Sequence, residues 1–204
     1  MKKLNLWWFL VLIGIGAGAV LYVDDRREAQ HKQEYVTHVA RAISYVGMAE
    51  LEAQQILDRW EESTPFEVLN SMLSISSSLH AAEVESDSLG GYLRYHDDLN
   101  WGGSSTFISY LFKFYKDVVD RRFRESWQYG HLSNLNGDEA VYWGSIRQDL
   151  TVLQRDLHHL ASVDSKVFEE NDRSKLYQFW IDWTSTLQFR EPHERYQQMY
   201  SMTP

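Results

Sequence analysis

An uninterrupted apolar segment near the N-terminus constrains this chain more than any other feature. It runs for 20 residues, Leu4–Val23, and Asn5 is its single strongly polar residue. An α-helix of this length spans about 30 Å, the hydrocarbon thickness of a lipid bilayer. Trp7 lies near one end and Tyr22 near the other, where aromatic side chains favour the membrane interface. The segment predicts a transmembrane signal anchor over residues 1–25.

Two fates of this anchor stay open. The small residues Ala17-Gly18-Ala19 resemble the cleavage site of a secretory signal peptide, and a cut near Ala19 would give a secreted soluble helical protein. The apolar run continues past that site through Val23, which favours an uncleaved, single-pass anchor. The basic start at Lys2 resembles a bacterial export signal, so we expect a cytoplasmic N-terminus and an extracytoplasmic domain.

Composition excludes several classes of function. The chain has 204 residues, no cysteine and a net charge of −9. Without cysteine there are no disulfides, thiolate metal sites or cysteine nucleophiles. The acidic balance argues against a nucleic-acid partner, which requires clustered Lys and Arg. Hydrophobic residues make up 44% of the chain, enough for a folded core.

The rest of the chain is predicted to be all-α. Apolar residues recur every three or four positions, and proline is rare. We expect an antiparallel bundle of four to five helices over 26–190 and a C-terminal tail over 191–204. The expected helical segments are 26–62, a second one from Pro65, 106–129, one from about 138, a short turn over 164–170, and a last one from 172. The first of these has no breaker before it and is expected to continue from the anchor.

The second helix has a clear start signal. Thr64 suits the N-cap, Pro65 the first helical position, and Glu67 completes a capping box. The residues expected to face the core from this helix are Phe66, Leu69, Leu73, Ser76, Leu79, and Ala82 or Glu83. The corresponding sets are Val39, Ala42 or Ile43, Val46, Ala49, Ala53, Ile56 and Trp60 in the first helix, and Tyr142, Ile146, Leu150, Leu153, Leu157 and Leu160 in the fourth.

The segment 86–106 interrupts the helical pattern and concentrates large and acidic side chains between two glycine pairs. Loops of this length in compact domains are uncommon and often functional. We expect a partner-contact surface here, formed by Tyr92, Tyr95, His96, Asp97, Asp98 and Trp101. The alternative is that these rings fold back over the bundle as a lid.

Gly14 and Gly18 form a G-x-x-x-G pattern on one face of the anchor. This spacing is typical of transmembrane helix dimers, so a homodimer through this face is one hypothesis. Small residues are common in membrane helices, and incidental spacing is the simpler interpretation.

Chemical motifs are weak. Glu28-x-x-His31 and Asp156-x-x-His159 have a spacing seen in di-iron bundles, but exposed polar residues explain them better. We interpret His158 and His159 as side chains that suit the negative end of the helix dipole near a helix C-terminus. No nucleophile, phosphate-loop or zinc motif is present in the sequence. We therefore predict no catalytic residue, no cofactor and no metal.

These features together favour a membrane-tethered, extracytoplasmic helical interaction or accessory domain without catalytic activity. The expected partners are the lipid bilayer, a membrane or envelope protein complex, and a second copy of the chain. A membrane-bound hydrolase or metal-dependent enzyme with a site in the bundle core stays the alternative, and a buried cluster of His and carboxylates would favour it.

Overall fold

The structure is a computed structural model that describes residues 2–88, 112–113, 115–124, 138–170 and 172–185. These residues form helices α1 (Lys2–Asp58), α2 (Pro65–Ser88), α5 (Asp138–Ala161) and α6 (Arg173–Ser185) and the 3-10 helix η1 (Ser165–Glu169). Residues 115–124 are also helical. The described part of the chain contains no strand, and the all-α class is confirmed.

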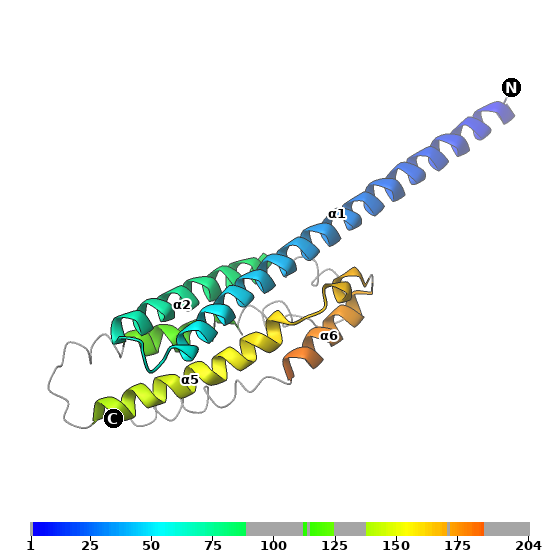
Figure 1. Cartoon of the computed structure of the whole chain (residues 1–204). Helices are drawn as coiled ribbons and strands as arrows, with labels where there is room; N and C mark the ends of the chain where they lie inside the picture. The colour runs from blue at the N-terminus through cyan, green and yellow to red at the C-terminus, as the bar shows by residue number, and fades with distance from the viewer. Residues whose placement is uncertain (1, 89–111, 114, 125–137, 171, 186–204) are drawn as a thin grey trace, which may run out of the picture.

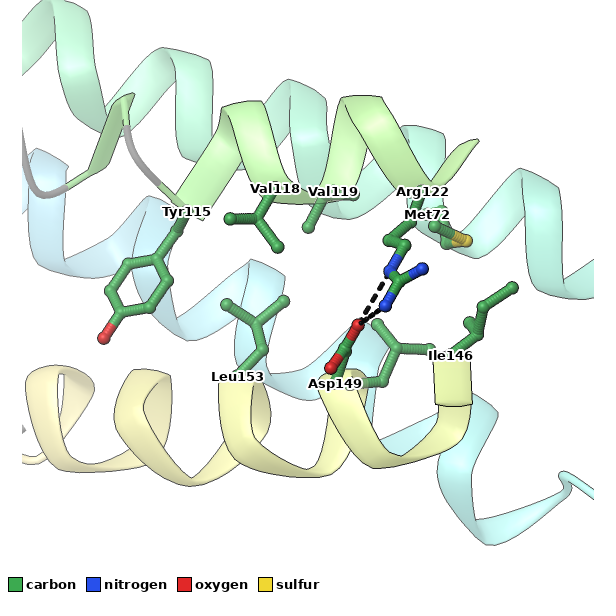
Figure 2. Close-up of a pocket in the computed structure, with 9 residues that line it drawn as sticks. Met72, Tyr115, Val118, Val119, Arg122, Ile146, Asp149 and Leu153 are labelled. Atoms are coloured by element: carbon green, nitrogen blue, oxygen red, sulfur yellow. Dashed lines mark hydrogen bonds and ion pairs between the residues drawn. The ribbon is translucent and has the colours of Figure 1, made fainter. Parts of the chain in front are cut away.

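The helices form a bundle around the C-terminal half of α1. The connection 59–64 is short, so α2 returns antiparallel along α1, and α5 packs along another side of α1 (Figure 1). The helix 115–124 lies against α5 (Figure 2), while η1 and α6 lie near the place where α1 leaves the bundle (Figure 1). The predicted helical bundle is thus confirmed.

The start of α2 is a capping box, as predicted. The backbone N–H and the hydroxyl of Thr64 each donate to Glu67 Oε2 at 2.7 Å, and the Glu67 N–H lies 3.3 Å from Thr64 Oγ1. These bonds satisfy amides that the first helical turn leaves without partners, which fixes the start at Pro65. The first helix ends slightly earlier than predicted, at Asp58 instead of residue 62, because tight turns from Leu57 onward replace the helical pattern.

The core positions of α1 and α5 agree with the predicted stripes. The buried side chains of α1 are Tyr35, Val39, Ala42, Val46, Ala49, Ala53 and Ile56, and those of α5 include Ile146, Leu150, Leu153, Leu157 and Leu160. Spacing by three and four residues places each set on one helix face, which packs into the common core.

The predicted core face of α2 is wrong in part. Phe66 and Leu73 are 66% and 46% exposed, whereas Val68, Met72 and Ile75 are buried. Ser76, Leu79 and Ala82 are buried as predicted. The error has a physical reason, since α2 carries apolar residues at helical spacing on two faces and spacing alone does not say which face packs.

The predicted loop also begins too early. Helix α2 continues through Ser88, and Ser86 is buried with its hydroxyl donating to the Ala82 carbonyl at 2.6 Å. This hydroxyl bonds back to its own helix, so serine at position 86 does not interrupt it. The remainder of the predicted loop lies outside the described residues.

The N-terminal half of α1 extends away from the bundle (Figure 1). The side chains from Ile13 to His31 are exposed, and from Ile13 onward Tyr35 is the first buried residue of α1. The side chains of residues 2–12 lie outside the described part. Among the residues that were described, no helix has both the length and the apolar character that a membrane span requires.

Candidate functional site

The strongest polar cluster in the bundle lies between α5 and the helix 115–124. Arg122 Nε donates to Asp149 Oδ2 at 2.7 Å, and Nη2 of the same guanidinium lies 2.6 Å from that oxygen (Figure 2). The two side chains are only 11% and 10% exposed. A buried, hydrogen-bonded ion pair of this kind holds two helices in one register, because sliding either helix would leave a buried charge without its partner.

A second buried contact joins the same two helices two turns further along α5. The Tyr115 hydroxyl donates to Asp156 Oδ2 at 2.6 Å. Burial, together with the negative charge of Asp156, raises the pKa of the Tyr115 phenol far above its usual value. The phenol therefore stays protonated and acts as a permanent hydrogen-bond donor in the folded protein.

The opposite side of helix 115–124 contacts α2 through Asp120. The hydroxyl of Ser76 in α2 donates to one carboxylate oxygen of Asp120, and Lys116 Nζ donates to the other at 2.8 Å. The hydrogen bond to Asp120 raises the pKa of Lys116. Three aspartates thus connect this helix and its two neighbours.

A small pocket adjoins the Arg122–Asp149 pair (Figure 2). Its lining is otherwise mostly apolar and consists of Met72, Tyr115, Val118, Val119, Ile146, Leu150 and Leu153 in addition to the ion pair. Its volume is about 20 Å³, enough for about one water molecule. The arrangement can hold a water beside an ion pair, and it is too small for an organic substrate.

The histidine and acidic side chains of the two E-x-x-H-like motifs do not come together in one site among the described residues. His31 lies 3.8 Å from Glu34 on the exposed part of α1. Asp156 is buried against Tyr115, whereas His159 Nε2 lies 3.1 Å from the Trp183 carbonyl, and the His159 and Trp183 rings stack at 4.2 Å. In the part of the chain that the structure describes, no three His, Asp or Glu side chains are placed to hold a metal ion.

His158 also has a specific partner. Its Nδ1 lies 3.3 Å from Glu50 Oε1, and Gln154 donates to the same oxygen at 3.0 Å. His158 and His159 lie in the last turn of α5, as the helix-end interpretation requires, and each also contacts another helix. Their role in the structure is to attach α5 to α1 and to α6.

The other predicted site residues form no described cluster. Gly14 and Gly18 lie on the exposed part of α1, and a Cβ added at either would meet nothing within 4 Å. The loop residues Tyr92, Tyr95, His96, Asp97, Asp98 and Trp101 lie outside the described residues.

Sequence reasoning missed the buried ion pair, although one signal for it is present. Asp149 directly precedes Leu150 within the apolar stripe of α5, and a carboxylate at the edge of a core face requires a donor from another helix. The sequence has four arginines within 121–147 that could supply the donor. Only the three-dimensional packing selects Arg122.

No protein-family model, no curated protein and no solved structure matches the chain.

Proposed function

We propose that this chain is a membrane-tethered, extracytoplasmic helical domain that acts by binding a membrane or envelope protein complex, without catalysis of its own. Residues 4–23 would anchor it, the following part of α1 would join the anchor to the bundle, and the bundle would present its helices and the rest of the predicted loop, residues 89–106, to a partner.

The observation that carries the proposal is the free, apolar end of α1. Ile13, Ile15, Val20 and Leu21 are all more than half exposed, and they belong to the N-terminal half of α1, which extends away from the bundle (Figure 1). A row of exposed aliphatic side chains on an isolated helix is unfavourable in water and favourable in hydrocarbon. The same helix continues without interruption into the core, so whatever binds its free end also positions the bundle.

The polar core supports a binding role over an enzymatic one. The buried carboxylates Asp149 and Asp156 are held by Arg122 and Tyr115, and the pocket beside them has room for about one water molecule. These groups serve helix packing. A catalytic site would need a larger cavity and groups that are able to reach a substrate.

The anchor is tested by a pair of matched variants. Ile13→Arg places a charge at the middle of the apolar run, where insertion is disfavoured by about 2.5–3.5 kcal/mol. Leu51→Arg is the control, since Leu51 lies on the bundle and is 55% exposed against 53% for Ile13. After alkaline carbonate extraction of membranes, we expect the wild-type protein and Leu51→Arg in the pellet and a large share of Ile13→Arg in the supernatant. Equal release of all three would contradict the anchor.

The same fractionation decides between an uncleaved anchor and a secreted protein. N-terminal sequencing of the mature chain should give a start upstream of residue 4. A mature start at Val20 would instead show cleavage after Ala19 and a soluble product.

The side of the membrane is tested by cysteine labelling, for which the cysteine-free chain is well suited. Ser77 is exposed on α2, so Ser77→Cys gives a single accessible thiol. A membrane-impermeant maleimide should label it in cells whose outer membrane has been permeabilised and whose inner membrane is intact. Labelling only after complete lysis would place the bundle in the cytoplasm.

The partner surface is tested at two rings of the predicted loop. Tyr95→Ala with Trp101→Ala should reduce the capture of cross-linked partners in intact cells and leave the unfolding temperature unchanged. Unfolding of this double variant would show that the rings belong to the core, as the lid interpretation holds.

A further inference from the structure

A second pocket is lined by residues of η1, of α6 and of the connection between them. These two helices lie near the end of the bundle from which the free part of α1 emerges (Figure 1). The lining residues of the pocket are Lys166, Val167, Glu170, Lys175 and Leu176, and its volume is about 330 Å³. This volume falls at the lower end of the range for small-ligand sites. The pocket thus combines space for a small group with two ammonium groups and an apolar wall formed by Val167 and Leu176.

The two lysines differ in their partners. Lys175 Nζ lies 3.6 Å from Glu170 Oε2, and the two side chains are 68% and 39% exposed. The Lys166 ammonium makes no ion pair or hydrogen bond with any residue that the structure describes. The pocket lining therefore carries two positive charges and one negative charge.

Two acidic residues beside the pocket, Asp164 and Asp172, accept backbone hydrogen bonds at the start of a helix. Asp164 Oδ1 accepts a hydrogen bond from the Lys166 backbone N–H at 3.0 Å, and Asp172 Oδ1 accepts one from the Ser174 N–H at 2.9 Å. Glu169 contributes its carbonyl, which accepts from Lys32 Nζ at 2.6 Å. This last bond brings a third ammonium, from α1, to the same end of the bundle.

If residues 4–23 cross the bilayer, the pocket would lie close to the bilayer surface. Lys32 follows Val23 by nine residues, which corresponds to about 13 Å along the helix. The headgroup layer occupies about 5–8 Å on each side of the hydrocarbon core. Lys32 would then stand within about one Debye length of the headgroups, a distance at which charges still interact at physiological salt.

We propose that the pocket between η1 and α6 binds the phosphate of an anionic phospholipid headgroup. Lys166 and Lys175 would donate to the phosphate oxygens, and the side chains of Val167 and Leu176 would contact the glycerol part of the lipid. The proposal rests on the proposed membrane tether, because the tether is what places this end of the bundle at the headgroups.

The test uses the full-length protein in micelles of an uncharged detergent, titrated with dihexanoyl phosphatidic acid and followed by calorimetry. The comparison ligands are dihexanoyl phosphatidylcholine, which has the same chains and no net charge, and inorganic phosphate. The variant is Lys166→Gln with Lys175→Gln, and the matched control is Lys113→Gln, an exposed lysine that is not among the residues lining the pocket. Far-ultraviolet circular dichroism verifies that each variant is folded, and Lys166→Gln alone replaces the double variant should that one unfold.

We expect phosphatidic acid to bind more tightly than phosphatidylcholine or inorganic phosphate. The double variant should weaken phosphatidic acid binding about 10-fold or more, since each lysine near an anionic surface contributes to attraction, and Lys113→Gln should leave it unchanged. Binding of inorganic phosphate as tight as that of phosphatidic acid would overturn the lipid assignment. Unchanged affinity in the pocket variants, or no binding at all, would overturn the site itself. Carbonate extraction reports on the tether separately, so failure of one proposal is distinguishable from failure of the other.

Discussion

Arg122 and Asp149 form an ion pair with an Nη2–Oδ2 distance of 2.6 Å, and Arg147 and Glu61 form another with an Nη1–Oε1 distance of 2.6 Å. The first pair is nearly buried between two helices, whereas the second is largely exposed at the distal end of the bundle. Because the two ion pairs have the same N–O distance and differ in burial, comparing them measures how burial changes the contribution of an ion pair to stability.

Removing one partner of the buried pair should strongly destabilise the fold. Asp149→Asn leaves the Arg122 guanidinium without its carboxylate in a mostly apolar setting, and we expect a loss of about 3–5 kcal/mol of unfolding free energy. Glu61→Gln, the exposed control, should cost at most about 1 kcal/mol. Urea denaturation of the two variants measures both values, and equal losses would contradict the role of burial.

The Tyr115 phenol should not ionise in the folded protein below about pH 11, because burial and Asp156 raise its pKa. The ultraviolet absorbance rise of tyrosinate between about pH 9 and pH 11 should therefore be the same in wild type and in Tyr115→Phe. A smaller rise in the variant, by the amount of one tyrosine, would show that Tyr115 ionises normally.

The raised pKa of Tyr115 also predicts that the folded protein loses stability at alkaline pH. The unfolded chain releases the Tyr115 proton above the ordinary pKa of 10.0, while the folded protein retains it. The unfolded state then binds fewer protons, so the unfolding free energy falls as the pH rises past that value. Urea midpoints should fall less steeply with pH in Tyr115→Phe than in wild type, and parallel curves would contradict the linkage.

The capping box at the start of α2 makes a contribution to the free energy of unfolding that depends on pH. Hydrogen bonds from Thr64 lower the pKa of Glu67 below its ordinary value of 4.5. This contribution is present above that pH and is lost as the pH falls through the lowered pKa. Thr64→Ala should cost about 1 kcal/mol at neutral pH, and the difference from wild type should shrink in acid. A difference that is independent of pH would contradict the Thr64–Glu67 interaction.

Hydrogen exchange should divide α1 into two parts. Residues 24–31 are exposed, whereas the face beginning at Tyr35 is buried. A helix without tertiary packing frays readily, so the amides of 24–31 should exchange much faster than those of 39–56. In detergent micelles the amides of 4–23 should be protected, and rapid exchange there would contradict the tether.

Much of the fold is predictable from the sequence, for identifiable reasons. The capping box at Thr64 and the stripes of α1 and α5 depend on neighbours within one helix, and spacing determines such neighbours directly. Helix α2 shows the limit of this reasoning. Phe66 and Leu73 mark one apolar face, Val68 and Met72 another, and only contact with the rest of the bundle selects the second.

The candidate sites were less predictable than the helices. The Arg122–Asp149 pair joins side chains 27 residues apart, and the η1–α6 pocket is lined by residues of two different helices. Such contacts follow from how helices pack against one another, which no local pattern specifies. The loop residues Tyr95 and Trp101 lie outside the described part, so the partner surface stays a prediction.

The uninterrupted helix α1 ties the rotational angle of the bundle to that of its free end. Each residue of an α-helix turns the chain by about 100° and advances it by about 1.5 Å. One alanine inserted after Glu28 would therefore rotate the bundle by about 100° about the helix axis relative to residues 4–23. Seven inserted residues would restore its original rotation to within about 20° and move the bundle about 10 Å further along the axis. For a domain that binds a partner in the plane of a membrane, the length of the segment 24–34 therefore determines which face of the bundle is directed toward that partner.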